Sequence, residues 1–167
     1  MRPPLLRWRH VVLLALHCGT ALAGSFDARV VGVTDGDTLT VLDAGHRQWK
    51  IRLAGIDAPE KRQAFGQQSK QALADRVFDR HVVIDAGKTD RYGRTVGKVI
   101  AAGEDVNLEL VRKGLAWHYK KYEREQSAPD RLHYARAEQD ARRNQRGLWQ
   151  QPEPVAPWDY RLQKRER

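Results

Sequence analysis

Apolar and polar residues alternate along several short segments of the chain, which is the pattern of strands with one buried face. The segments are 28–34, 38–42, 49–53, 81–85 and 95–101. Turn residues separate the first three: Asp35-Gly36-Asp37 follows the first, and a loop with Gly45 follows the second. Consecutive strands joined by tight turns predict an antiparallel meander at the start of the domain.

The apolar spacing changes to the period of a helix in three other segments, residues 65–79, 106–113 and 130–146. Gly114 suits the left-handed position after the second helix. Asp130 is the expected cap at the start of the third. Five strands interleaved with three helices in this order predict an α+β protein. Its expected architecture is a five-stranded OB fold, a small β-barrel with helices on its outside.

The two ends of the chain differ from this pattern. Residues 1–23 join three arginines to an apolar stretch that ends in Ala-Leu-Ala, which is typical of a secretory signal peptide. The apolar run is too short for a membrane helix. We therefore expect cleavage before Gly24 and export, either to a periplasm or to the medium. Residues 24–150 then form one domain, and residues 151–167, with three prolines and a basic end, form an extended tail.

Net charge narrows the class of partner. The whole chain has 30 Lys and Arg residues against 21 Asp and Glu residues. Three of the arginines fall within residues 1–23, so the remainder keeps 27 against 21 and a net charge of +6. The single cysteine, Cys18, falls there too, so an exported domain would have no disulfide. The positive charge favours a polyanionic partner, although charge alone does not identify one.

The segment Lys50–Glu60 combines several groups suited to phosphoryl chemistry. Arg52 lies between two apolar residues, so the strand period places it on the face opposite the core. Pro59 restricts the loop that follows, so that Asp57 and Glu60 sit in a stiff segment. A carboxylate such as Glu60 can orient or deprotonate an attacking water. Alone, it would be read as a solvated loop charge.

A pair of aspartates is expected at the same rim of the barrel. Asp37 precedes the strand 38–42, and Asp57 follows the strand 49–53. Neighbouring strands of a meander run antiparallel, so the start of one strand lies beside the end of the next. Two carboxylates without histidine or cysteine favour Ca²⁺ or Mg²⁺. One aspartate after a strand is usually a plain turn residue, so the pairing carries this hypothesis.

Arginine and aromatic residues complete the candidate site. Arg94 ends a polar loop directly before the strand 95–101, and with Arg52 it could clamp a phosphate and stabilise a charged transition state. Either arginine alone would suit a surface salt bridge. Trp117, Tyr119 and Tyr122 lie among lysines, a pattern that suits base stacking beside a phosphate track. Core packing for Trp117 and one tyrosine remains equally open.

Several segments in this order resemble the staphylococcal nuclease (thermonuclease) family. They are Val-Thr-Asp-Gly-Asp-Thr at 33–38, Ile-Arg-Leu at 51–53, Ile-Asp-Ala-Pro-Glu at 56–60, Asp-Arg-Tyr-Gly-Arg at 90–94 and Val-Asn-Leu-Glu-Leu-Val-Arg-Lys-Gly-Leu-Ala at 106–116. The resemblance covers about residues 28–149. It implies an OB barrel and a Ca²⁺-dependent endonuclease that cleaves DNA and RNA and leaves 3′-phosphate ends.

The resemblance also implies a role for individual residues. Asp37 and Asp57 match the side-chain ligands of Ca²⁺. Ala58 stands where the family has threonine, which binds the ion through its backbone carbonyl, so the change should not remove that ligand. The remaining matches are Arg52 and Arg94 as phosphate-binding arginines, Glu60 as the glutamate usually described as general base, and Tyr92, Tyr119 and Tyr122 as substrate-binding tyrosines. Tyr122 is preferred over Tyr119 as the base-stacking residue.

Two other functions compete with the enzyme. A non-catalytic OB-fold module that binds nucleic acid would need neither Glu60 nor paired carboxylates. An exported domain that is merely stabilised by Ca²⁺ would leave the arginines and the positive charge unexplained. We therefore expect a phosphodiester hydrolase with DNA and RNA as partners. It should act as a monomer, without a stable protein partner or a membrane anchor after the signal is cleaved.

Overall fold

The computed structural model describes residues 24–166, so the predicted signal peptide at residues 1–23 lies outside the described residues. The sheet strands are β1 (Gly24–Asp35), β2 (Thr38–Asp43), β3 (Gln48–Leu53), β5 (His81–Thr89), β6 (Thr95–Ala101) and β7 (Glu104–Asp105). Every expected strand is present. β1 and β5 run longer than expected because they extend each other, with Gly24 opposite Ala86.

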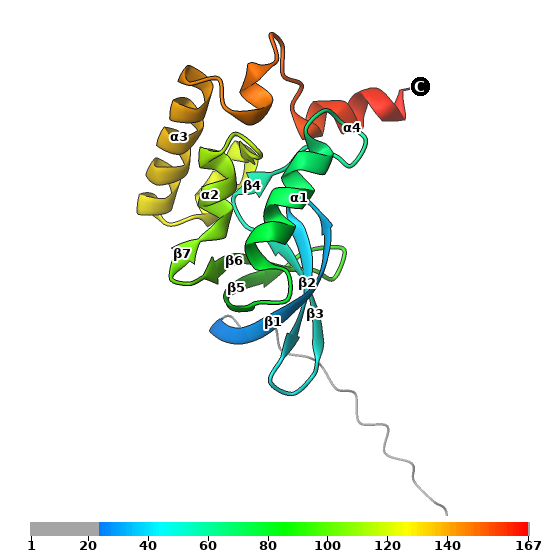
Figure 1. The fold of residues 1–167 in the computed structure, drawn as a ribbon, viewed down its shortest axis with the longest axis vertical. Helices are drawn as coiled ribbons and strands as arrows, with labels where there is room; N and C mark the ends of the chain where they lie inside the picture. The colour runs from blue at the N-terminus through cyan, green and yellow to red at the C-terminus, as the bar shows by residue number, and fades with distance from the viewer. Residues whose placement is uncertain (1–23, 167) are drawn as a thin grey trace, which may run out of the picture.

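The strands close into a barrel (Figure 1). Their order is β3-β2-β1-β5-β6-β7, and β3 also pairs with β6 in parallel, which joins the two sides of the sheet. This confirms the predicted five-stranded OB fold, with β7 as a short addition. A separate pair, β4 (Ile56–Asp57) with β8 (Trp117–His118), was not predicted because two-residue strands show no periodicity.

The three expected helices are α1 (Gly66–Val77), α2 (Val106–Arg112) and α3 (Ala128–Arg143). Two 3₁₀ segments, η1 (Lys120–Glu125) and η2 (Gly147–Gln150), accompany them, and η1 is kinked at Tyr122. Gly114 adopts the expected left-handed conformation, with φ of 66°. The predicted cap of α3 was wrong. Ser127, not Asp130, caps this helix, and its side chain accepts a hydrogen bond from the Asp130 N–H at 3.2 Å.

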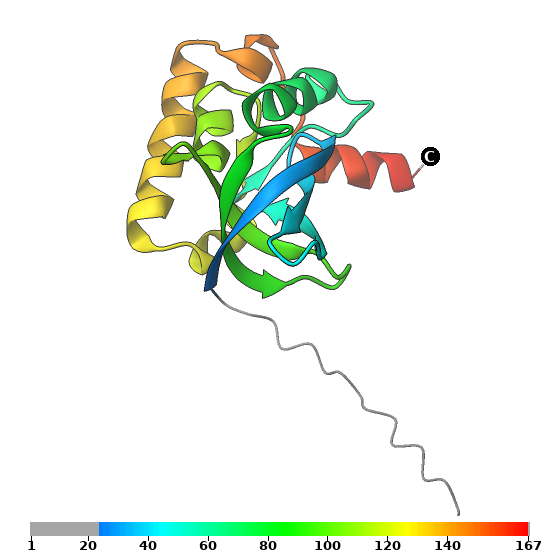
Figure 2. The same cartoon turned by 60° about the horizontal axis from the view of Figure 1, so that its bottom comes forward.

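The C-terminal segment is not the extended tail that the prolines suggested. Residues Pro157–Arg165 form a further helix, α4. Proline is tolerated at the first helical position because its missing N–H has no partner to lose there. Trp158 then stacks on Tyr119, with ring centroids 5.3 Å apart and planes inclined by 9°. α3 and α4 lie on opposite sides of the molecule (Figures 1 and 2).

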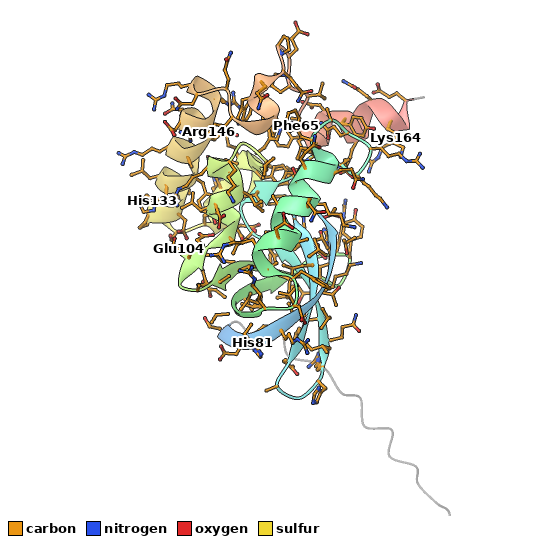
Figure 3. All side chains as sticks on the ribbon, viewed as in Figure 1. Phe65, His81, Glu104, His133, Arg146 and Lys164 are labelled. Atoms are coloured by element: carbon orange, nitrogen blue, oxygen red, sulfur yellow. The ribbon has the colours of Figure 1, made fainter. Side chains whose placement is uncertain are left out.

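Apolar side chains form two clusters. The larger one fills the barrel and the space beneath α1 and α2. The smaller one joins α3, η2 and the chain leading to α4, and its buried members are Trp117, Ala141, Leu148, Trp149 and Ala156. Phe65, directly before α1 (labelled in Figure 3), packs against this smaller cluster. Trp158 packs against the same cluster. Trp117 is therefore a core residue. Within residues 24–166, no helix has the length and apolar character needed to cross a membrane.

Candidate active site

One cavity of about 1060 Å³ opens at the rim of the barrel. Every site residue expected from the sequence lines it: Asp37, Arg52, Asp57, Ala58, Glu60, Tyr92, Arg94, Tyr119 and Tyr122. They come from separate segments of the chain, as the antiparallel arrangement of the first strands and the loop before β6 required. The structure brings all of them together, and it leaves none of them on another face of the barrel.

Strand register places the two aspartates. Thr38 pairs with Arg52 across β2 and β3, so Asp37 lies at the level where β3 ends. The Ala58 N–H donates to Asp37 Oδ2 at 2.7 Å, which ties the loop after β3 to the turn before β2. Gly36 makes this approach possible, because a Cβ there would lie only 2.7 Å from the Ala58 Cβ. The Asp-Gly-Asp sequence thus serves a tight packing of two site loops.

The two carboxylates are buried and share one arginine. Asp37 is 6% exposed and Asp57 is 1% exposed. Arg52 lies 3.2 Å from Asp37 Oδ2 and 2.8 Å from Asp57 Oδ1. Burial raises the pKa of Asp57, and the negative charge of Asp37 raises it further. A hydrogen bond from Arg161 and the charge of Arg52 act to lower this pKa, but the net shift is upward. The pair therefore favours additional positive charge beside it.

Asp35 supports the same turn. Its Oδ1 accepts a hydrogen bond from the Asp37 N–H at 3.1 Å. Burial and the nearby charge of Asp37 raise the pKa of Asp35 to about 6. Asp35 thus braces the turn that carries Asp37, and its raised pKa reflects burial and the negative charge already present beside it.

A hard divalent cation fits this donor set. Buried carboxylate oxygens, with a backbone carbonyl such as that of Ala58 nearby in the chain, are the ligands that Ca²⁺ and Mg²⁺ take. Among residues 24–166, no three His, Cys, Asp or Glu side chains are grouped so as to hold a metal ion. A cation held by Asp37 and Asp57 would therefore complete its coordination with carbonyl, water or substrate oxygens.

The backbone of Glu60 is bound to Gln63. The Glu60 N–H donates to the Gln63 side chain at 3.0 Å, and the Glu60 carbonyl accepts from the Gln63 N–H at 2.8 Å. Gly66, at the start of α1, lets this loop pack closely, because a Cβ there would lie 2.0 Å from the Glu60 carbonyl oxygen. The Glu60 side chain, 40% exposed, remains open to the cavity.

The two expected arginines are engaged differently. Arg52 donates to the carbonyls of Leu53 and Ile56 at 3.1 and 3.0 Å, so the end of β3 fixes it. Arg94 is paired with Asp90, with 2.8 Å from Nε to Oδ2. Burial raises the pKa of Asp90, but hydrogen bonds from Arg94 and the Tyr92 N–H outweigh it and lower this pKa overall. Arg94 therefore reaches the cavity from a loop braced by its own ion pair.

The three tyrosines of the cavity differ in their solvent exposure. Tyr92 is 66% exposed and Tyr122 is 41% exposed. One face of Tyr119 is covered by Trp158, and Tyr122 meets Tyr119 edge-on at 5.1 Å. Lys88 lies 5.2 Å from the Tyr122 ring centroid. An exposed ring beside lysines keeps Tyr122 the better candidate for base stacking.

Among the charged residues that line the cavity, Arg161 on α4 was given no role by the sequence reasoning. It contacts both Asp57 and Glu60, with 2.7 Å from Nη2 to Asp57 Oδ2 and 2.7 Å from Nη1 to Glu60 Oε1. The sequence offers one signal for it. Trp158 and Arg161 are three residues apart, so a helix that starts at Pro157 places both on one face.

Comparison with known proteins gives the same family as the motifs. The family described as staphylococcal nuclease homologue matches residues 50–151. An uncharacterized endonuclease of Haemophilus influenzae is 42% identical over 82% of this chain and 74% of its own length. Protein ParB of Escherichia coli is 44% identical over 83% of this chain and 80% of its own length. A micrococcal nuclease of Shigella flexneri is 39% identical over 81% of this chain and 80% of its own length. The chain therefore belongs to the staphylococcal nuclease family and is a nuclease, a hydrolase of the phosphodiester bonds of nucleic acid.

Proposed function

We propose that the protein is an exported, Ca²⁺-dependent endonuclease that cleaves both DNA and RNA and leaves 3′-phosphate ends. The observation that carries the proposal is the convergence of paired aspartates, a glutamate and two arginines on one cavity. We further propose that it acts as a monomer without a stable protein partner, because one chain supplies every expected residue of that cavity.

The aspartate pair would hold the cation. Asp37 and Asp57 supply side-chain oxygens, and Ala58 supplies its carbonyl. When bound, Ca²⁺ would polarise a phosphate oxygen and make a nearby water more acidic. Arg52 fixes the orientation of both carboxylates, through contacts of 3.2 Å and 2.8 Å.

Glu60 would act on the attacking water. It takes or directs a proton of the water as the water oxygen forms a bond to phosphorus. The bond from phosphorus to the 5′-oxygen breaks, and that oxygen takes up a proton from solvent water. The products are a 3′-phosphate and a 5′-hydroxyl. Arg52 and Arg94 would donate to the phosphate oxygens as they gain charge. Hydrolysis requires removing on the order of 20 kcal/mol of barrier, and each well-placed donor contributes about 3–4 kcal/mol.

Export rests on the signal-peptide pattern of residues 1–23 and the basic charge of the remainder. The mass and N-terminal sequence of the protein recovered from the periplasm or medium of an expressing bacterium test it. A mature chain that starts at Gly24 is the expected result. A full-length chain retained in the cytoplasm would contradict export but not nuclease activity.

A cleavage assay separates the enzyme from a non-catalytic binding module. Single-stranded and double-stranded DNA and an RNA of similar length are incubated with Ca²⁺, with EDTA, and with EDTA followed by excess Ca²⁺. We expect cleavage of each in Ca²⁺, none in EDTA, and recovery on addition, with 3′-phosphate product ends. Glu60→Gln should retain binding and cleave far more slowly, at a rate that can still be measured. Binding by the unmodified protein without cleavage would instead support the binding module, and activity in EDTA would exclude the proposed cation.

A further inference from the structure

Arg161 joins the C-terminal helix α4 to the candidate active site. Its guanidinium donates from Nη2 to Asp57 Oδ2 at 2.7 Å and from Nη1 to Glu60 Oε1 at 2.7 Å. Nη1 also lies 3.4 Å from Asp57 Oδ1. One planar group therefore bridges the expected metal ligand and the expected base, which are otherwise held only by separate contacts.

These contacts are not those of a surface ion pair. Exposed pairs contribute little because water solvates both charges. Here Asp57 is 1% exposed and Arg161 is 38% exposed. A guanidinium with fixed donors also binds two carboxylates with more geometric definition than an ammonium does. Arg161 therefore fixes the positions of the two carboxylates.

α4 has its own attachment to the body of the protein. Trp158 stacks on Tyr119 and meets Trp117 edge-on at 5.5 Å. The Gln63 side chain donates to the Val155 carbonyl at 2.6 Å, and the same Gln63 side chain accepts from the Glu60 N–H. Gln63 thus links the loop that carries Glu60 to the segment that leads into α4, independently of the Arg161 contacts.

We propose that Arg161 is a positioning residue of the nuclease site, which holds the Glu60 carboxylate beside Asp57 and weakens the binding of a cation to the Asp37–Asp57 pair. The inference rests on the function proposed above for these carboxylates. The helix α4 then contributes a functional residue to the site.

Two consequences follow from the position of the charge. A guanidinium at 2.7 Å from Asp57 repels any cation bound to the same carboxylate, so its removal strengthens cation binding. Its removal also frees the half-exposed Glu60 side chain to rotate, and misplacement of a reacting group by about 1 Å can reduce turnover by roughly a hundredfold. Cation affinity and turnover should therefore change in opposite senses.

The experiment compares Arg161→Gln and Arg161→Lys with the matched control Lys164→Gln in the full-length mature protein. Lys164 is exposed near the outer end of α4 (Figure 3), so its replacement removes the same charge from the same helix. Calorimetry with CaCl₂ and no nucleic acid measures cation affinity. Steady-state cleavage of single-stranded DNA at saturating Ca²⁺ gives kcat and KM separately.

For Arg161→Gln we expect Ca²⁺ to bind about three- to tenfold more tightly, and kcat to fall by about tenfold or more, with a smaller change in KM. Its melting temperature in EDTA should fall, because the carboxylates lose their counter-charge, and Ca²⁺ should restore it. Arg161→Lys keeps the charge without the bidentate fork, so it should retain near-normal Ca²⁺ affinity while kcat falls. Lys164→Gln should match the unmodified protein in all three measurements.

A double-mutant cycle with Glu60→Gln tests whether Arg161 acts through Glu60. If it does, adding Arg161→Gln to Glu60→Gln lowers kcat by much less than Arg161→Gln does alone. Additive losses would overturn the positioning role. A kcat above that of the unmodified protein would also overturn it, because the helix would then obstruct the site.

The remaining outcomes are equally decisive. Arg161→Gln that behaves like Lys164→Gln in Ca²⁺ affinity and kcat refutes the inference while leaving the nuclease intact. If Arg161→Gln does not fold, Arg161→Lys decides, since unchanged kcat in that variant contradicts the need for a fork. An unmodified protein that cleaves nothing refutes the proposed function instead, and the Ca²⁺ titration of Arg161→Gln then still reports whether the charge opposes cation binding.

Discussion

Gly66 allows the loop that carries Glu60 to pack against the start of α1, and Gly66→Ala should therefore damage catalysis more than folding. A methyl group at this position would lie 2.0 Å from the Glu60 carbonyl oxygen and 2.8 Å from its carbonyl carbon. Both atoms belong to the backbone, so no side-chain rotation can relieve the contact. The loop has to move instead.

The size of the effect follows from that displacement. Ordinary contacts of a Cβ begin near 3.4 Å, so the Glu60 carbonyl has to retreat by roughly 1.4 Å, a shift of the order that reduces turnover about a hundredfold. Asp37 lies on another segment, and Arg52 and Arg161 hold the Asp57 side chain, so Ca²⁺ affinity should change less than kcat.

The assay measures kcat on single-stranded DNA, Ca²⁺ affinity by calorimetry and the melting temperature of the same preparation. Gly32→Ala is the matched control, because its added methyl would have no neighbour closer than the Thr40 Cβ at 3.8 Å. We expect kcat to fall about a hundredfold in Gly66→Ala and to stay normal in Gly32→Ala. Normal turnover in Gly66→Ala would refute the argument that the backbone position of Glu60 sets the rate.

Two further substitutions test other parts of the structure. Arg94→Ala should lower kcat by about a hundredfold or more, because the transition state loses a charged donor; Arg80→Ala, which removes an exposed arginine outside the cavity, is the control, and equal rates in both would remove the role given to Arg94. Tyr134→Phe should lower the free energy of unfolding by about 1.5 kcal/mol in a urea titration, because the buried hydroxyl donates to Asp105 at 2.9 Å. Tyr160→Phe on α4 is its control, and an unchanged urea midpoint in Tyr134→Phe would contradict the estimate.

The barrel could be predicted because its signal is local. Apolar alternation marks each strand separately, and the turn at Asp35–Asp37 forces the first two into a hairpin. The same reasoning placed Asp37 and Asp57 at one rim, since antiparallel neighbours bring the start of one strand beside the end of the next. The observed register, with Thr38 opposite Arg52, agrees with this placement. No sequence pattern of comparable strength marks β4 and β8, because strands of two residues are defined by the partner that they meet.

The C-terminal helix was misjudged for a related reason. When residues 151–167 are taken alone, their three prolines favour an extended chain. In the folded protein α4 is held by the contacts of Trp158 with Tyr119 and Trp117, which lie in a distant part of the sequence. Tertiary contacts decide this helix, and single-sequence propensity does not contain them. The cap of α3 is a different case, because Ser127 with a proline in the first helical turn is a local signal that the sequence already contains.

The extent of the site differs from the extent of the family match. The matched segment covers residues 50–151, yet Asp37 precedes it and Arg161 follows it, and both line the same cavity. Asp37 is tied to the matched segment by the hydrogen bond from Ala58, and Arg161 by its bridge to Asp57 and Glu60. Asp57, 1% exposed, is thus contacted by Arg52 of β3 and by Arg161 of α4, and its neighbour Ala58 is bound to the turn before β2. A buried carboxylate in this position needs positive charge beside it, and Arg161 supplies part of that charge from outside the matched segment.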